Sequence, residues 1–264
     1  MKLRVVGTGL TVVCCSAALA VSYLLYQQKI ELPTPMIEAE AEQPAPKVVE
    51  PAAEAEPALD GESLEALTAN MDVPARELFL QRASAGEKVK LLVTGSDVMM
   101  EGGPGYAARL KDALEEAYAG LIEVKLVSFS GTSKTFTDQF VDLSAGYDVV
   151  LLEPFTLENN GVVTIEEEHA AISAFMEEVK TVTPDAELIL HPPQPLFGAN
   201  YYLTQVSALE EFAAAQDYGY IDHWSAWPST DDEALKEFVT DSGIPNGTGA
   251  EVWADELAGY FIAD

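Results

Sequence analysis

From residue 87 onward, short apolar runs alternate with amphipathic stretches of helical length. This alternation constrains the fold strongly, because strands separated by helices form a parallel sheet with helices on both faces. Strands are expected at 89–95, 122–129, 147–155, 186–193 and 218–224. Helices are expected at 104–120, 164–182, 203–217, 231–239 and 248–262. Right-handed crossovers then predict a three-layer α/β/α domain with a five-stranded parallel sheet over residues 87–264.

The functional residues of such a domain are expected just after its strands, because ligands of open α/β sheets bind outside the carboxyl ends of the strands. Residues 95–97 (Gly-Ser-Asp) follow the first strand and residues 130–132 (Ser-Gly-Thr) follow the second. Residues 153–161 follow the third strand, and His191 follows the fourth. Residues 241–249 lead into the last expected helix.

These segments resemble the SGNH, or GDSL, family of serine esterases and acyl hydrolases, and the resemblance covers residues 88–263. Two stretches, EPFTLENNG at 153–161 and DHWSAWP at 222–228, resemble the membrane-anchored SGNH proteins of Gram-positive bacteria. The resemblance implies a flavodoxin-like, three-layer fold. It also implies a nucleophilic serine in a Gly-Asp-Ser after the first strand, and an oxyanion hole from a glycine and an asparagine after the next two strands. An Asp-x-x-His near the C-terminus would supply the acid and the base.

The positions of the nucleophile and the base depart from the family pattern. The nucleophile position is Asp97, and Ser96 lies one residue early. Asp241 matches the acid, but Ile244 stands where the histidine belongs. A serine hydroxyl needs a base to attack at neutral pH, and an isoleucine side chain accepts no proton.

The oxyanion hole is only partly matched. Gly131 matches the glycine after the second strand, but Glu158 stands where the asparagine belongs. A carboxylate repels a developing oxyanion instead of stabilising it. Asn159 or Asn160 can take this role if the register shifts.

We expect a catalytically degenerate protein that binds an envelope glycan, an acyl ligand or a protein partner. The alternative is an active ester hydrolase with a rearranged site, in which Ser96 is the nucleophile and His191 is the base. A third hypothesis is a structural module that holds its tether at the cell surface, whatever its pocket does. A short-ester assay separates the first hypothesis from the second.

No metal or cofactor is expected. Asp97, Glu153, Glu158 and Asp241 can gather carboxylates at one edge of the sheet, but their spacing is not that of a metal site. The three histidines are scattered, and both cysteines lie in the apolar N-terminus.

The N-terminus predicts a membrane anchor. Lys2 and Arg4 precede an uncharged stretch from residue 5 to residue 26. Such a stretch is long enough to span a bilayer, and the positive end favours the cytoplasmic side. We therefore expect a single-pass signal anchor at residues 1–30 with the rest of the chain outside the cell membrane. The alternatives are a signal peptide cleaved after Ala20 and, more weakly, lipidation at one of the two cysteines.

Residues 31–86 are predicted to form an acidic linker. The segment is rich in Pro, Ala and Glu up to residue 62, and such a composition buries too little apolar surface to offset its ordering entropy. A short helical pattern at residues 63–85 indicates either a docked helix or more linker. The formal net charge of −30 argues against nucleic-acid binding, which needs clustered Lys and Arg.

Overall fold

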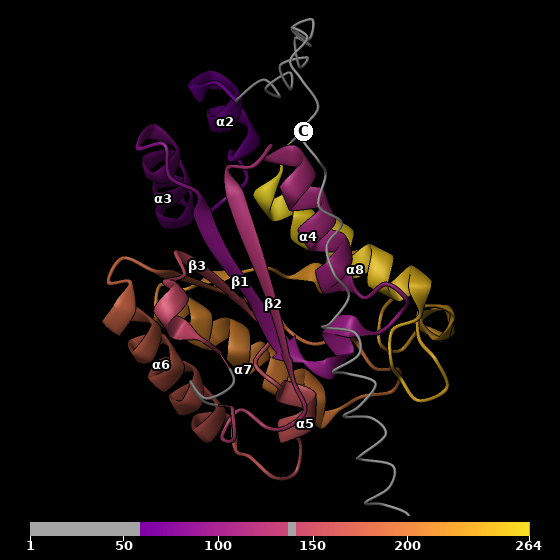
Figure 1. Cartoon of the computed structure of the whole chain (residues 1–264). Coiled ribbons are helices and arrows are strands. Elements are labelled where there is room, and N and C mark those ends of the chain that lie inside the picture. Colours follow the sequence, from indigo (N-terminus) through magenta and orange to yellow (C-terminus); the bar gives the residue numbers. More distant parts are fainter. Residues whose placement is uncertain (1–58, 137–140, 264) are drawn as a thin grey trace, which may run out of the picture. The chain divides into compact units, whose positions relative to one another are not determined.

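A computed structural model describes residues 59–136 and 141–263 of the chain (Figure 1). The predicted anchor at residues 1–30 and most of the predicted linker lie outside these ranges. Within the described ranges, none of the helices combines the length and the apolar character that a membrane crossing needs.

Strands and helices alternate along the described chain, with several short 3-10 helices (η) between them. The strands are β1 (Val89–Ser96), β2 (Ile122–Phe129), β3 (Val149–Leu152), β4 (Glu187–Leu190) and β5 (Gly219–Tyr220). The α-helices are α2 (Gly61–Leu67), α3 (Val73–Ser84), α4 (Tyr106–Ala117), α5 (Thr156–Asn159), α6 (Ile165–Val182), α7 (Tyr201–Ala215) and α8 (Gly247–Phe261). The 3-10 helices are η1 (Asp97–Met100), η2 (Leu143–Ala145), η3 (His223–Ala226) and η4 (Glu233–Glu237).

The five strands form one sheet in the order β2-β1-β3-β4-β5, and all neighbouring pairs are parallel. This order is that of flavodoxin-like folds, in which the order of the strands along the sheet reverses between β1 and β3. The three-layer α/β/α architecture with a five-stranded parallel sheet is therefore confirmed. The expected helix at 231–239 is instead the shorter 3-10 helix η4.

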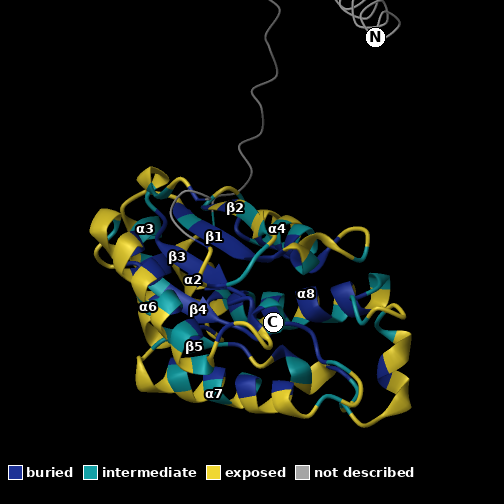
Figure 2. Ribbon diagram, turned by 90° about the horizontal axis from the view of Figure 1, so that it is seen from below, coloured by how far each residue is buried: buried dark blue, intermediate teal, exposed yellow. Residues whose placement is uncertain are grey.

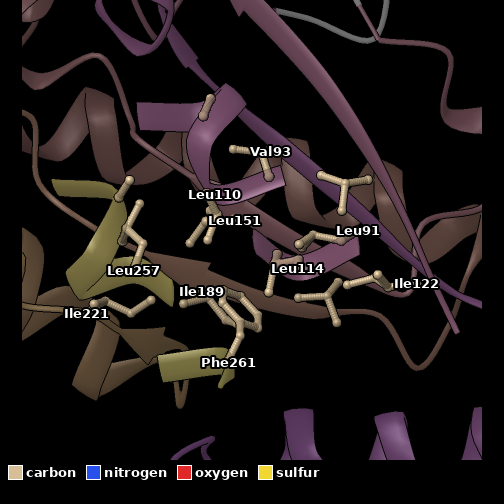
Figure 3. Packing of buried hydrophobic residues seen from close by; sticks show 14 of the residues in the cluster. Leu91, Val93, Leu110, Leu114, Ile122, Leu151, Ile189, Ile221, Leu257 and Phe261 are labelled. Carbon is tan, nitrogen blue, oxygen red and sulfur yellow. The ribbon is translucent and has the colours of Figure 1, made fainter. Parts of the chain in front are cut away.

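Alternate residues of each strand point into two separate cores, as the pleat of a sheet requires. Leu91 and Val93 of β1 pack with α4 and α8 on one face, whereas Leu92 packs with α6 and α7 on the other. Figure 3 shows the first core, and Figure 1 shows the helices on the two sides of the sheet. The inner strands β1, β3 and β4 are largely buried, and the outer helix faces carry many of the exposed residues (Figure 2). The near-continuous apolar character of these three strands in the sequence follows from this burial on both faces.

Helix α6 starts with a capping box formed by Thr164 and Glu167. The Thr164 hydroxyl accepts a hydrogen bond from the Glu167 N–H, and the Glu167 carboxylate accepts one from the Thr164 N–H. These two bonds satisfy backbone donors that the first helical turn leaves without intrahelical partners.

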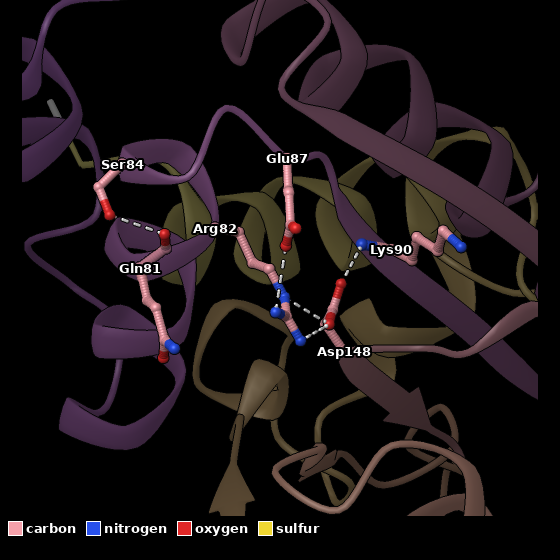
Figure 4. A network of polar contacts seen from close by, with 6 residues as sticks. All are labelled: Gln81, Arg82, Ser84, Glu87, Lys90 and Asp148. Atoms are coloured by element: carbon pink, nitrogen blue, oxygen red, sulfur yellow. Dashed lines mark hydrogen bonds and ion pairs between the residues drawn. The ribbon is translucent and has the colours of Figure 1, made fainter.

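The packed domain begins before the predicted boundary at residue 87. Leu64 of α2 and Leu78 and Phe79 of α3 are buried in the first core. In the last turn of α3, the Arg82 guanidinium contacts the buried Asp148 carboxylate, with Nη2 at 2.7 Å from Oδ1 (Figure 4). Asp148 also accepts the backbone N–H of Lys90, so this pair joins α3 to β1. The last part of the predicted 31–86 linker is therefore structured, because its apolar residues recur at helical spacing and cover the sheet.

Candidate functional site

The ends of β1 and β3 are joined by one buried carboxylate. Glu153 is 1 % exposed and directly follows β3. Its Oε2 accepts the N–H of Ser96 at 2.8 Å, and its Oε1 accepts the N–H of Phe155 at 2.9 Å. A side chain at Gly95 would place its Cβ 2.7 Å from the Glu153 Cβ, so glycine permits this approach. The sequence Gly-Ser-Asp after β1 thus accommodates a glutamate on the neighbouring strand.

The Glu153 carboxylate also stabilises a turn in which Phe155 has a left-handed backbone conformation. Phe155 has φ of 64°, a conformation that costs a residue with a Cβ on the order of 1 kcal/mol or more. The hydrogen bond from its N–H to Glu153 and the contact of its ring with Phe136 fix this turn. Helix α5 starts directly after it, which places Glu158 and Asn159 at the carboxyl edge of the sheet.

Ser96 is not presented to solvent. It is the last residue of β1 and is 2 % exposed. Its hydroxyl and its N–H both lie against Glu153, where they lower the pKa of that carboxyl. The group beside the Ser96 hydroxyl is therefore a carboxyl group.

Three carboxyl groups act on one another at this edge. Burial and, to a smaller extent, the negative charge of Glu158 together raise the pKa of Glu153 to about 7. Burial also raises the pKa of Glu158, and the charge of the exposed Asp97 adds to this effect. The predicted gathering of carboxylates therefore holds for these three residues. Among the described residues, no three His, Cys, Asp or Glu side chains are placed to hold a metal ion.

The proton on Glu153 should make stability depend on pH. The pKa of about 7 lies above the ordinary value of 4.5, so the folded state holds the proton more tightly than the unfolded chain. The resulting stabilisation is fully present below pH 4.5 and is lost as the pH rises through 7, a change of about 2–3 kcal/mol for this group. We expect the wild type to lose this much free energy of unfolding relative to Glu153→Gln between those pH values.

Denaturant titrations across this range measure the difference directly. Glu116→Gln is the matched control, because Glu116 is exposed on α4 and its removal changes the net charge equally. Its curve should run parallel to that of the wild type. Parallel curves for wild type and Glu153→Gln would contradict the burial of a protonated carboxyl.

The residues at the expected oxyanion hole have other partners. The Asn159 side chain is buried, and its Oδ1 accepts hydrogen bonds from the N–H and the hydroxyl of Ser133. Its Nδ2 donates to Glu168 at 2.6 Å and to the Pro154 carbonyl at 3.3 Å. The amide group of Asn159 is thus fully used inside the protein, which argues against the register shift considered from the sequence. Asn160, the other candidate, is exposed beyond α5.

Gly131 follows β2 in a turn that admits no side chain. An added Cβ would lie 2.5 Å from the Phe129 ring and 2.9 Å from the Thr135 hydroxyl. This packing explains the glycine without any role in catalysis.

The segment expected to hold the acid and the base is a tight turn before α8. The N–H of Thr240 donates to the Ile244 carbonyl at 2.7 Å, and the N–H of Ile244 donates to the Thr240 hydroxyl at 3.3 Å. Asp241 lies at the exposed tip of this turn, and the Ile244 side chain is half-buried. Asn246 caps α8 by accepting the N–H groups of Thr248 and Gly249. The turn carries Asp241 and Ile244, and neither side chain supplies the neutral imidazole base that a serine nucleophile needs.

His191 lies in an aromatic cluster. Its ring makes edge contacts with Tyr106, His223 and Trp253, with centroid distances of 5.6, 5.9 and 5.8 Å. Its Nδ1 is 3.2 Å from the Pro192 carbonyl, and because a carbonyl only accepts, Nδ1 carries the proton. Burial lowers the pKa of His191 to about 3, so the ring is neutral. These contacts are those of a core histidine rather than of a base serving Ser96.

Gln194 was not identified from the sequence. It follows β4, is 3 % exposed, and its Nε2 donates to the Gly243 carbonyl at 3.1 Å, which ties this loop to the turn before α8. Its own backbone carbonyl accepts the hydroxyl of Tyr202 at 2.9 Å. The only signal for Gln194 in the sequence is that a glutamine stands within an apolar, Pro-rich loop. The sequence does not reveal that the turn before α8 lies next to this loop.

No family model and no curated protein matches the sequence. Solved structures do match. A GDSL-like lipase from Parabacteroides merdae is 15% identical with a TM-score of 0.55, over 66% of this chain and 95% of its own. A lipolytic protein of the G-D-S-L family from Desulfitobacterium hafniense is 17% identical with a TM-score of 0.53, over 66% and 99%. An acetylxylan esterase from Geobacillus stearothermophilus is 19% identical with a TM-score of 0.52, over 66% and 94%. The chain therefore has the fold of SGNH/GDSL hydrolases.

Proposed function

We propose that this chain is a membrane-anchored, extracytoplasmic SGNH-fold protein that has lost serine hydrolase chemistry and binds a glycan at the carboxyl edge of its sheet. The observation that carries the proposal is the pairing of Ser96 with Glu153. The Ser96 hydroxyl is buried against this carboxyl group, and the Asp97 carboxylate occupies the exposed position that the family gives to its nucleophile. A site of this kind binds but has no accessible hydroxyl to attack with.

Several features of this edge suit a glycan. Carboxylates accept hydrogen bonds from sugar hydroxyls, and Asp97 and Glu158 lie here. Tyr201, at the start of the helix that follows β4, is 58% exposed, whereas the Phe197 ring is covered by the Lys236 ammonium at 4.0 Å from its centroid. Aromatic rings provide flat apolar surfaces with a polar edge, which sugars can stack on. An anionic ligand is disfavoured by the negative charge of the site.

Binding of neutral and amino glycans to the full chain, measured by calorimetry, tests this function. The double variant Asp97→Ala/Tyr201→Ala should weaken binding at least tenfold, because it removes an acceptor and a stacking surface. Glu116→Gln should bind like the wild type. If no glycan binds at millimolar concentration, or the double variant binds unchanged, the proposed site is wrong. Capture of an acyl ligand or a protein at the same edge would identify the other ligand classes instead.

The anchor is supported by the uncharged stretch behind Lys2 and Arg4. Protease added outside intact cells that express the full chain should remove the domain. A domain fully protected from the protease would contradict this orientation.

One observation favours a second function, that of an ester hydrolase. The Ser96 hydroxyl lies beside Glu153, whose pKa of about 7 is suitable for a general base. In this alternative, Ser96 is the nucleophile as the sequence suggested, but Glu153 takes the place of His191. The burial of Ser96 and the engagement of Asn159 argue against it.

A further inference from the structure

One edge of the sheet lies in an open groove. Strand β5 is the last strand of the sheet and pairs only with β4, so within the described ranges its other side has no neighbouring strand. A cavity of about 610 Å³ lies here, lined by β5, the first residues of β4, the start of α3 and the last turns of α7 and α8. We call this cavity the β5 groove. None of Asp97, Glu158 and Tyr201 lines it, so it is separate from the carboxyl edge.

The backbone of β5 presents hydrogen-bonding groups to this groove. The Ile221 N–H donates to the Leu190 carbonyl at 2.9 Å and therefore points toward β4. Along a strand of a parallel sheet, the N–H and C=O of successive residues point to opposite sides. Tyr220, which lines the groove, therefore turns its N–H and C=O away from β4. An open edge of this kind can pair with an extended segment of another chain.

The start of α3 is fixed against β5 and forms one wall of the groove. An added Cβ at Gly219 would lie 2.9 Å from Asp72 Oδ2, so the glycine permits this close contact. The Tyr260 hydroxyl donates to Asp72 Oδ2 and accepts the Asp72 N–H, both at 3.2 Å. Asp72 is the N-cap residue of α3, yet its side chain makes no capping hydrogen bond. Its carboxylate thus lines the groove instead of capping its own helix.

The side chains of the groove are apolar and acidic. Val73 on α3 is 67% exposed, and the exposed Ala214 on α7 adds a second apolar contact surface. Among the described residues that line the groove there is no Lys, Arg or His, but there are four carboxylates, Asp72, Glu187, Glu210 and Asp217. None of the four takes part in an ion pair of the described chain. Burial raises the pKa of Glu187, and the charge of Lys180, which does not line the groove, opposes this rise.

We propose that the β5 groove binds an extended segment of a basic partner protein, which pairs with β5 as a sixth strand and places Lys or Arg side chains beside the groove carboxylates. Main-chain hydrogen bonds to Tyr220 position the segment, and its apolar side chains cover Val73 and Ala214. Charge complementarity identifies the partner as basic, because the groove supplies only negative charge. A second copy of this chain is disfavoured as the occupant by its own net charge of −30.

The probe is the heptapeptide Ser-Val-Lys-Val-Lys-Val-Ser, acetylated and amidated at its ends and titrated into the full chain by calorimetry in 0.15 M salt. We expect it to bind at least tenfold more tightly than the same peptide with Glu in place of Lys. A lysine peptide whose five central backbone nitrogens are methylated keeps the charges but cannot pair with a strand. We expect this peptide to bind at least tenfold more weakly than the unmethylated one.

Three variants place the peptide in the groove. Glu210→Gln/Asp217→Asn removes two groove charges and should weaken binding of the lysine peptide at least tenfold; asparagine suits the left-handed backbone of Asp217, with φ of 55°. Asp112→Asn/Glu116→Gln removes the same two kinds of charge from the exposed face of α4 and should bind like the wild type. Ala214→Trp fills the groove from an exposed helix position and should abolish binding. Thermal melts establish that all three variants are folded.

Each contrary result overturns the inference. Equal binding of the lysine and glutamate peptides removes the charge argument, and equal binding of the methylated peptide removes the strand pairing. Equal weakening by both double variants would assign the attraction to the net charge of the whole chain. Unchanged binding to Ala214→Trp would place the peptide elsewhere, and no binding of the lysine peptide at millimolar concentration would leave the groove without this partner. A dimer in sedimentation experiments that Ala214→Trp abolishes would assign the groove to a second copy. The glycan function is tested on other residues and stands or falls independently.

Discussion

On a short acyl ester, the full chain should turn over no faster than its Ser96→Ala variant. A working serine site needs an attacking hydroxyl, a base within hydrogen-bond reach and oxyanion donors. Here the exposed position carries Asp97, and Ile244 on the turn before α8 offers no base. Loss of one oxyanion donor costs about 10²–10³ in rate, and loss of the nucleophile or base costs on the order of 10⁴–10⁶. These losses do not add, because the groups act as a unit.

Restoring the family residues together should recover measurable activity. The triple variant Asp97→Ser, Glu158→Asn and Ile244→His supplies the hydroxyl, the donor and the base at the positions implied by the resemblance. Any single change should recover little, because each group depends on the others. The comparison of wild type, Ser96→Ala and the triple variant is made on one ester. Robust wild-type turnover that Ser96→Ala abolishes would instead support the hydrolase with Glu153 as base.

Replacement of Trp253 should destabilise the protein more than any other single change in the aromatic cluster. Trp253 is fully buried on α8 and stacks on Tyr106 at 4.1 Å and on His223 at 4.5 Å. Trp253→Ala leaves a large cavity between α8 and the sheet and should lower the free energy of unfolding by about 3–5 kcal/mol. Denaturant titration measures this loss.

The tryptophan N–H provides an internal control. In the described part of the chain, Trp253 Nε1 has no hydrogen-bond partner, whereas Trp224 Nε1 donates to the Pro193 carbonyl at 2.7 Å. Trp253→Phe therefore loses volume but breaks no hydrogen bond, while Trp224→Phe also leaves a carbonyl without its donor, which costs about 1–3 kcal/mol where that group is buried. A Trp253→Ala loss below about 1 kcal/mol would contradict this view of the core.

The sequence was sufficient to predict the sheet and its two layers of helices. Apolar runs such as residues 89–95 have a strand's length and lie between helical patterns, so their order determines the topology. The role of α2 and α3 was harder to predict, because a composition rich in Pro and Glu precedes them and only a few leucines mark their buried side. The ion pair of Arg82 with Asp148 joins residues far apart in the chain, which no local pattern reveals.

The sequence was sufficient to predict where the site residues lie, but not which residues they contact. The residues after the strands do lie at one edge, and Asp97, Glu153 and Glu158 do influence one another. The sequence could not show that Asn159 donates to Glu168, because this bond depends on how α5 packs against α6. It also could not show that His191 faces Trp253 rather than Ser96, since both lie beside the same sheet edge.

The proposed loss of a reactive serine is tested most directly by measuring the intact mass of the full chain after incubation with a fluorophosphonate. This reagent forms an adduct with an activated serine hydroxyl and releases fluoride. The triple variant Asp97→Ser, Glu158→Asn and Ile244→His serves as the matched positive control. We predict that the wild-type mass stays unchanged while the triple variant gains one adduct. A single stoichiometric adduct on the wild type, mapped to Ser96, would contradict the loss of serine chemistry.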